Sequence, residues 1–539
     1  MREVQVRHAA SVERAGAERG THDAGMAPTP NAPVPSRAAA ASAGIVAGGV
    51  ALAATELLAG ILPGAPSVVL EIGAFLISLQ PPGAKQIVVD LFGTGDKLAL
   101  NIAIVLGALV LAAGLGILAR YHRSWTTAGF TGIAVLGLLA SLRDPLVDGL
   151  LALVAAVLGV VVAYGVIGWL LRLATPSGEA WMPDWGRRRF IGTSIGVTAL
   201  AVAGGGVGRI LLNSRADAAP TPGSIPLAVD PVAPLVAGAK LDVAGITPIV
   251  VSNRDFYRID TQLLTPRIDV SDWTLNIDGM VDHPFSLDYA ELLAMEMHEQ
   301  YVTIACVSNE VGGDLVGNAL WKGVRLRDLL DRAGVQAGAS QLVGHSFDGW
   351  TAGFPTAWLD APDREALVAV AMNGEPLPAE HGFPARLIVP GLYGYVSATK
   401  WLTRIGLTTL EAFNGYWVPL GWAKEAPILT QSRIDVPKRG ESVNAGTVAV
   451  AGVAWAPDRG ISAVEVRVDD GSWAPAELSA AISDATWVQW LYRWPATAGT
   501  HILSVRATDG TGEVQTTDVT RPAPDGARGH HTISVQVSG

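Results

Sequence analysis

The chain has 539 residues, of which 50% are hydrophobic and only 16% charged, so it suggests roughly two to four domains and is too apolar for a purely soluble protein. Its net charge of −11 and the absence of a basic stripe exclude a nucleic-acid surface. One cysteine, Cys306, excludes a disulfide framework, a CxxCH haem attachment and a cysteine-ligated iron–sulfur cluster.

Residues 1–212 are predicted to form a membrane unit behind a disordered tail. Residues 1–42 are rich in Ala, Pro and Arg and lack apolar periodicity, which is typical of disorder. Five segments of about 20 apolar residues, long enough to cross a bilayer, follow at Ala43–Leu62, Leu98–Leu118, Trp125–Leu142, Gly149–Leu171 and Phe190–Leu212. The shorter apolar run Val68–Leu79 favours a re-entrant or interfacial piece.

The arginines predict the orientation of this unit. They gather before the first span, after the second and before the last. Five spans with a cytoplasmic N-terminus put all three groups in the cytoplasm and everything after Leu212 outside it. The run Gly186-Arg187-Arg188-Arg189-Phe190-Ile191 resembles a twin-arginine export signal, with an ordinary positive-inside anchor as the alternative. The unit's one histidine, His122, lies in a predicted loop, which disfavours a haem held between the spans.

A proline-punctuated segment, residues 213–245, is predicted to be a linker to a region of mixed α and β pattern, residues 246–420. The alternation in Trp273–Gly279 predicts a strand ending in an Asp-Gly turn. Ser286 is predicted to cap a helix, and Trp321–Leu330 reads as a second, amphipathic helix.

The single cysteine follows a buried strand. Tyr301–Ile304 is apolar and β-branched, and the residues after Cys306 are small and glycine-rich, as in a loop that approaches a ligand closely. From the residues alone, Cys306 is an inert buried thiol, a nucleophile or a single thiolate ligand to a soft metal.

Residues 421–539 are predicted to form an all-β companion domain. Alternating runs at Val464–Val468, Leu503–Ala507 and Ile533–Val537 are typical strands, and Thr447–Val450 precedes a further apolar run that ends at Trp455. Their regular spacing favours an immunoglobulin-like sandwich held by core packing, in which the tryptophans serve as core residues.

Six motifs follow one another in the middle region: Asn253-Arg-Asp-Phe256-Tyr257, Cys306-x-x-Asn309, Trp321-x-Gly323-x-x-Leu326, Met372-Asn-Gly, His381-Gly-Phe-Pro-x-Arg386 and Lys400-Trp401. In this order they resemble the molybdopterin-binding domain of the sulfite oxidase family. The C-terminal region, with Ser432-Arg-Ile-Asp and Trp487-Val-Gln-Trp490, is similar to the dimerisation domain of the same family. The expected fold is therefore an all-α transmembrane bundle, an α+β molybdopterin-binding domain and an all-β immunoglobulin-like sandwich.

The resemblance implies a molybdenum–pyranopterin cofactor, one per chain, with Cys306 as thiolate ligand to the metal and catalytic residue. A positively charged metal keeps such a thiol deprotonated. The other positions implied to contact the cofactor are Asn253, Phe256, Tyr257, Ser346, His381, Arg386, Ser397, Thr399 and Lys400. Arginine can grip a phosphate with two parallel hydrogen bonds, and lysine supplies a point charge.

Three positions depart from the sulfite-oxidising relatives. Where these carry two arginines and a tyrosine, this sequence has Ser252, Glu310 and Val370. A carboxylate in place of a cation disfavours a doubly charged oxyanion. The sequence therefore predicts a molybdenum oxidoreductase that acts on an unassigned small molecule, with sulfite disfavoured.

Two alternative functions and the choice among the possible partners stay open at this point. One alternative is a non-catalytic membrane binding or assembly protein that retains the fold, and another is a cysteine hydrolase that pairs Cys306 with His345 or His381. Expected partners are membrane lipid, an external electron carrier or a quinone, and a second copy of the chain through the C-terminal domain.

Overall fold

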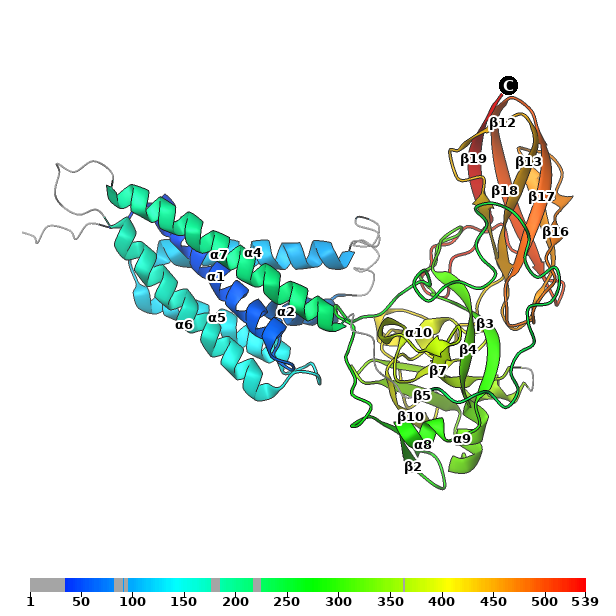
Figure 1. Cartoon of the computed structure of the whole chain (residues 1–539), viewed down its shortest axis with the longest axis horizontal. Helices are drawn as coiled ribbons and strands as arrows, with labels where there is room; N and C mark the ends of the chain where they lie inside the picture. The colour runs from blue at the N-terminus through cyan, green and yellow to red at the C-terminus, as the bar shows by residue number, and fades with distance from the viewer. Residues whose placement is uncertain (1–33, 82–90, 92–95, 176–184, 217–223, 362–363) are drawn as a thin grey trace, which may run out of the picture.

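A computed structural model describes residues 34–81, 91, 96–175, 185–216, 224–361 and 364–539. A helical N-terminal region is followed by a β-rich part, joined by a chain segment without regular structure (Figure 1). Disorder was predicted for residues 1–42; residues 1–33 lie outside the described residues, and the prediction is wrong for residues 37–42, which belong to a helix.

Five helices are long and apolar enough to cross a membrane, and a sixth, α2, is shorter. The helices of this region are α1 (Arg37–Ile61), α2 (Val68–Ser78), α4 (Asp96–Leu118), α5 (Arg123–Ser141), α6 (Gly149–Ala174) and α7 (Trp185–Ala216). They match the predicted spans and the predicted short piece. However, α1 begins at Arg37 instead of Ala43, because the Ser36 hydroxyl accepts a hydrogen bond from the Ala39 amide and an alanine run follows.

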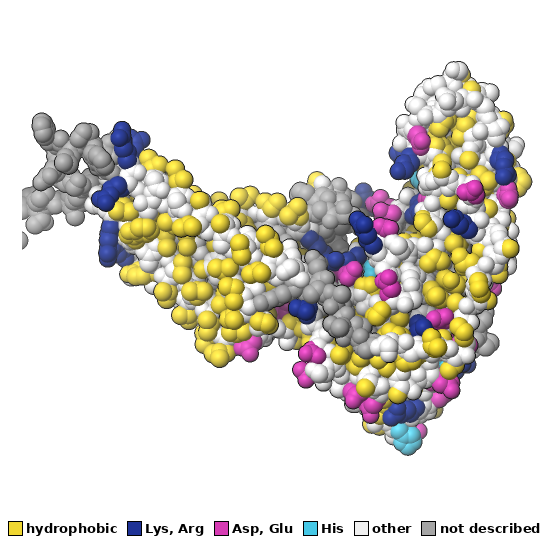
Figure 2. Space-filling model, in the orientation of Figure 1, with side chains coloured by type: hydrophobic (Ala, Val, Ile, Leu, Met, Phe, Trp, Pro, Cys, Tyr) yellow, Lys and Arg dark blue, Asp and Glu magenta, His cyan; other side chains and the backbone are white. Residues whose placement is uncertain are grey.

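Helix α1 lies at the centre of the bundle. Its glycines allow close backbone contact with two neighbours: Gly44 lies against Gly116 of α4, and Gly60 lies against Gly208 of α7. Figure 2 shows apolar side chains over the bundle surface and basic side chains at the end away from the β-rich part. That end holds the start of α7, with its Arg187–Arg189 run (Figure 1).

The region after the linker contains two sheets. The first has the strand order β2-β1-β10-β5-β6, and the second has β3-β4-β7-β8 with β9 paired to β7. The strands are β1 (Thr274–Gly279), β2 (Phe285–Asp288), β3 (His298–Ala305), β4 (Val316–Arg325), β5 (Gln341–Ser346), β6 (Thr351–Pro355), β7 (Leu367–Met372), β8 (Glu375–Pro376), β9 (Arg386–Ile388) and β10 (Leu402–Thr408). Three short helices accompany them, α8 (Tyr289–Leu293), α9 (Leu326–Ala333) and α10 (Gly394–Ser397).

Two helix predictions in this region are wrong in detail. Residues Trp321–Arg325 belong to β4, where they pair with β3 and β7, and only the following residues form α9. The Trp321 side chain is fully buried and donates to Val302 O, so tertiary packing decides its conformation. Ser286 lies in β2, and the cap of α8 is Asp288, which forms a capping box with Glu291.

The C-terminal region consists of two sheets around a shared core. Their orders are β11-β13-β17-β16 and β12-β19-β18-β14-β15. The strands are β11 (Gln431–Val436), β12 (Ser442–Asn444), β13 (Gly446–Trp455), β14 (Ile461–Val468), β15 (Ala474–Pro475), β16 (Glu477–Leu478), β17 (Val488–Ala496), β18 (Gly499–Asp509) and β19 (His531–Ser538). The predicted strands lie in β13, β14, β18 and β19. Trp455, Trp487, Trp490 and Trp494 are buried, as expected of core residues, whereas Trp473 is only half-buried and packs against Arg467 and Arg506.

Candidate functional site

Cys306 lies directly after β3 and is only 8% exposed. Its amide donates to Leu315 O at 2.9 Å, and its carbonyl accepts from the Asn309 amide at 3.0 Å. The Asn309 side chain then accepts from the Leu315 amide at 2.8 Å. The Cys-x-x-Asn sequence therefore closes a loop on itself and fixes the direction of the thiol.

The C-terminal region holds this loop from outside. Arg433 of β11 donates to Gly313 O at 2.7 Å and to Thr247 Oγ1 at 2.7 Å, while its Nε pairs with Asp435 at 2.6 Å. Gly312, at a φ of +80°, packs against the His531 ring, where no Cβ would fit. The loop is thus positioned by two parts of the chain that are far apart in sequence.

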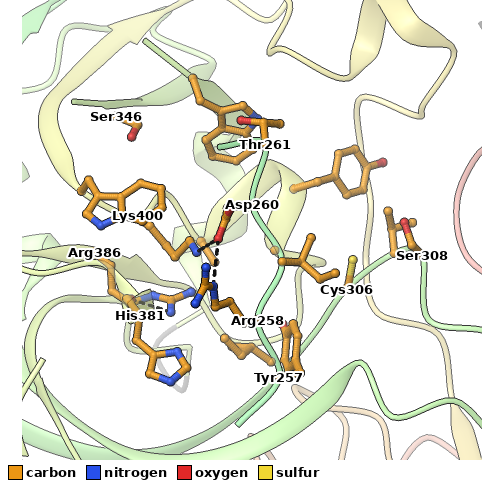
Figure 3. Close-up of a pocket in the computed structure, with 18 of the residues that line it drawn as sticks. Tyr257, Arg258, Asp260, Thr261, Cys306, Ser308, Ser346, His381, Arg386 and Lys400 are labelled. Carbon is orange, nitrogen blue, oxygen red and sulfur yellow. Dashed lines mark hydrogen bonds and ion pairs between the residues drawn. The ribbon is translucent and has the colours of Figure 1, made fainter. Parts of the chain in front are cut away.

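Cys306 faces a hollow that gathers most of the predicted site residues (Figure 3). The hollow has about 890 Å³ of empty space when its open mouth is counted. The predicted residues that line it are Phe256, Tyr257, Cys306, Ser346, His381, Arg386 and Lys400. Strand ends, loops and the start of β9 supply them, so the fold brings together residues from four separate motifs.

Arg386 and His381 form the floor of the hollow. The Arg386 guanidinium is 5% exposed, donates to His381 O at 2.9 Å and lies over the Trp321 ring at 5.1 Å. Burial lowers the pKa of Arg386 to about 10, which leaves it charged at neutral pH. Burial also lowers the pKa of His381 to about 4. Since His381 is neutral and its Nε2 lies 2.7 Å from the carbonyl of Asn253, Nε2 carries the proton and donates.

Lys400 is paired with a carboxylate in the wall of the hollow. Its Nζ lies 2.9 Å from Asp260 and 3.1 Å from Glu380 O. Asp260 also pairs with Arg258 at 3.6 Å and with Lys97, at the start of α4, at 3.0 Å. Burial opposes ionisation of Asp260, but the ammonium groups of Lys400 and Lys97 outweigh it and hold its pKa below the usual range. Burial lowers the pKa of Lys400 to about 8.

Several polar atoms in and behind the hollow lack hydrogen-bond partners among the described residues. They are Arg386 Nε, Ser346 Oγ, Thr399 Oγ1 and Trp350 Nε1. Buried polar groups are normally paired, and each unpaired group costs about 1–3 kcal/mol. Such a set around one hollow is the pattern expected of a site built to receive a polar ligand.

Three predicted contact residues do not line the hollow. The Asn253 amide bonds to Met372 O and to the Asn373 side chain, so it supports the Met-Asn-Gly turn, and its carbonyl holds His381. The Ser397 hydroxyl donates to Tyr393 O at 3.0 Å. Thr399 is fully buried behind the wall. These side chains are placed to support the site from behind.

The three departures from the relatives lie elsewhere than expected. Glu310 and Ser252 are exposed, Val370 is fully buried in β7, and none of them lines the hollow. Because the Glu310 carboxylate does not line the hollow, its charge gives no reason to disfavour an oxyanion substrate there. His345 does not line the hollow either, and its Nε2 lies 2.9 Å from Arg404 Nη1.

Sequence reasoning missed part of the lining. Arg258 and Asp260 lie directly after the Phe256-Tyr257 motif. This neighbouring position is the one feature of the sequence from which their place in the lining could have been predicted. A further part of the lining is aromatic and comes from loops and from α10, and it consists of Trp350, Tyr395, Trp417 and Trp422.

Comparisons with known proteins match the same region. The family model described as oxidoreductase molybdopterin binding domain matches residues 262–417. The uncharacterized oxidoreductase YuiH of Bacillus subtilis (strain 168) is 38% identical over 154 residues, which are 29% of this chain and 74% of that protein. The region that the family model matches contains Cys306, His381, Arg386 and Lys400.

Longer and more distant matches extend the comparison. Human mitochondrial sulfite oxidase is 30% identical over 292 residues, which cover 45% of this chain and 53% of that protein. The chain thus spans about half the length of the sulfite oxidases it matches. The solved structure of the sulfane dehydrogenase SoxCD from Paracoccus pantotrophus is 21% identical, with a TM-score of 0.47, and covers 59% of this chain and 94% of that one.

Proposed function

The chain belongs to the sulfite oxidase family of molybdopterin oxidoreductases and is an enzyme, and from this premise we propose that the hollow around Cys306 is its active site. The family implies a molybdenum–molybdopterin cofactor. We assign one cofactor per chain, with the Cys306 thiolate as metal ligand. The observation that carries the proposal is the convergence of Cys306, Arg386 and Lys400 on one hollow.

The residues present fit this cofactor. The Arg386 side chain has a charged guanidinium whose Nε lacks a partner within the described chain, and Ser346 offers an unpaired hydroxyl. Charge-assisted hydrogen bonds from such donors suit the phosphate and ring heteroatoms of a pyranopterin. Cys306, buried at the end of β3, offers the soft thiolate that a metal of this kind takes.

When bound, the cofactor supplies two-electron or oxygen-atom exchange with a small molecule. The residues of the chain bind and surround this group. Arg386 and Lys400 balance the negative charge of the ligand, and the hydrogen bond to Asn253 fixes the tautomer of His381. The aromatic side chains of the wall limit the entry of water into the hollow. The substrate is a small molecule that we leave unassigned. Sulfite remains disfavoured only by the sequence differences at Ser252, Glu310 and Val370, which lie off the hollow.

We further propose that the N-terminal region is a multi-pass anchor in the cell membrane. Five helices are long and apolar enough to cross a bilayer, and the basic end of the bundle lies opposite the β-rich part (Figure 2). This supports a cytoplasmic N-terminus, lipid around the bundle and an extracytoplasmic active site, with Arg187–Arg189 as a twin-arginine export signal.

We assign the remaining parts by their sheets and connections. Residues 43–212 form the membrane unit, 213–245 the linker, 246–420 the catalytic domain and 421–539 an immunoglobulin-like sandwich. Two sheets with a shared core support the last assignment. A homodimer through this sandwich follows from the family resemblance.

Metal and pterin analysis of the full purified chain tests the active site. We expect about one molybdenum and one pterin per chain, and a Cys306→Ser variant that loses molybdenum while its melting transition is unchanged. Absence of both molybdenum and pterin from the wild-type chain would contradict the proposal and favour a binding or assembly role.

A further inference from the structure

The rim of the hollow meets the outer end of the membrane unit. Lys97, at the start of α4, pairs with Asp260 at 3.0 Å and donates to Gln262 O at 2.6 Å. Next to this contact, Gly73 of α2 packs against the Leu263 side chain. One side of the mouth is therefore built on helices of the membrane unit.

The turn between β5 and β6 carries Asp348 and Trp350, which line the hollow.

The outer half of the hollow is aromatic. Tyr395 and Trp422 have ring centroids 5.8 Å apart, and Trp417 and Trp422 have centroids 6.4 Å apart. Trp350 completes this group, and its Nε1 is buried without a hydrogen-bond partner among the described residues. Flat apolar walls with an unused N–H donor suit a flat ring that carries a carbonyl oxygen.

The chain needs a separate electron carrier for its reaction. Its single cysteine excludes a CxxCH-attached haem and cysteine-ligated iron–sulfur clusters, and we expect the electrons to pass to or from another molecule. A protein carrier requires an exposed docking face at the mouth, whereas α4 and α2 border the mouth on one side. A lipid-soluble carrier instead reaches such a mouth from the bilayer.

We propose that the aromatic outer half of the hollow, between Trp350 and Trp422, binds a lipid-soluble quinone that exchanges electrons with the active site. This rests on the proposed function. Transfer of an oxygen atom from water to a small substrate releases two electrons and two protons, and a quinone that takes up two electrons and two protons becomes a hydroquinone. The two half-reactions balance, and they balance equally in the reverse direction.

Binding of decylubiquinone to the full chain in lipid nanodiscs tests the proposal. Quenching of tryptophan fluorescence should saturate, above the partition measured with empty discs. Trp350→Phe keeps the ring but removes the N–H donor, and should weaken binding about fivefold, the ratio expected for one neutral hydrogen bond. Trp422→Leu should weaken it further through lost ring contact. Trp473→Phe is the matched control, because Trp473 lies in the C-terminal region, just before β15, where its ring contacts the guanidinium groups of Arg467 and Arg506.

Several outcomes would overturn the inference. These are non-saturable binding, an unchanged affinity in both Trp350→Phe and Trp422→Leu, and phospholipid that occupies the site and is not displaced by the quinone. Reduced protein that passes electrons to soluble cytochrome c but not to decylubiquinone would also overturn it. Molybdenum analysis of the same sample separates the two proposals. Protein that contains molybdenum but does not bind the quinone refutes this inference alone. Protein that binds the quinone but contains no molybdenum refutes the proposed function.

Discussion

Lys97 of α4 and Asp260 in the wall of the hollow connect the helical N-terminal region with the β-rich part through a 3.0 Å ion pair. The Asp260 carboxylate is only 5% exposed and is shared with Lys400, which lines the same hollow. A side chain from α4 therefore contacts Lys400, a proposed cofactor-contact residue, through one intermediate residue, Asp260. The helical N-terminal region thus contributes to the wall of the hollow as well as to the proposed membrane anchor.

Replacement of Lys97 by methionine should weaken cofactor retention. The Asp260 carboxylate then keeps only Lys400 and Arg258 as partners, and the rim loses its bond to Gln262 O. Because the Lys97 side chain is 40% exposed, the loss should be modest, about 1 kcal/mol or roughly fivefold in cofactor affinity. Pterin content after size-exclusion chromatography measures it.

A matched control for this substitution is Lys322→Met. Lys322 also forms a 3.0 Å ion pair, with Glu299, but lies outside the hollow. It should lose stability without selective loss of pterin. Equal pterin loss in both variants would mean that the Lys97 pair acts only on general stability.

Arg386→Lys should reduce cofactor retention more strongly than Lys97→Met. Lysine keeps the charge but cannot supply the two parallel donors of a guanidinium, and it loses the contact with the Trp321 ring. The loss of one charge-assisted hydrogen bond is worth about 1.5–3 kcal/mol, which is roughly 10- to 150-fold in affinity. Pterin fluorescence of the denatured, purified variant gives the content.

Arg404→Lys serves as the control for that exchange. Arg404 is also bound to a carboxylate, Asp278, and it does not line the hollow. If Arg386→Lys retained the cofactor as well as Arg404→Lys does, Arg386 would not hold it.

The strand before Cys306 and the apolar spans could be predicted because each depends on local pattern. Tyr301–Ile304 is β-branched and apolar, and it lies within β3 as expected. The motif residues Cys306, His381 and Arg386 were predicted to share a site from family order alone. This prediction was possible because the sequence has the same residue types at the same spacing as the motifs of the family.

The errors come from contacts between distant parts of the chain. The spacing of apolar residues in Trp321–Leu330 suits a helix, but pairing with β3 and β7 places Trp321 in a strand. The Lys97–Asp260 pair joins residues 163 positions apart, and no local pattern marks either residue. Likewise, Glu310 was expected beside the substrate, yet the turn after Asn309 directs it to solvent.

Arg433→Met should loosen the Cys306 loop. The guanidinium holds Gly313 O and Thr247 Oγ1, and its loss leaves the Asp435 carboxylate, 8% exposed, without its closest cation. Removal of one member of a buried pair costs about 3–5 kcal/mol. The melting transition of the full chain should fall, and molybdenum content with it. Arg493→Met, which breaks an exposed pair with Glu477, should leave both unchanged, and equal effects would contradict the role of Arg433.

His531 should make the protein less stable in acid. Burial lowers its pKa to about 4, with the nearby Arg439 and Arg433 acting in the same direction, and its Nδ1 accepts a hydrogen bond from the Ile434 amide. Between pH 6.5 and 4 the unfolded chain binds a proton at this residue that the folded chain does not, so stability falls as the pH decreases through this window and is retained above it. The full contribution is about 3 kcal/mol.

In His531→Asn the amide oxygen can still accept from Ile434, and the variant cannot titrate, so its melting temperature should depend less on pH than that of the wild type across this window. His530→Asn controls for the neighbouring ring, and an identical acid profile in wild type and His531→Asn would show that His531 does not titrate in this range.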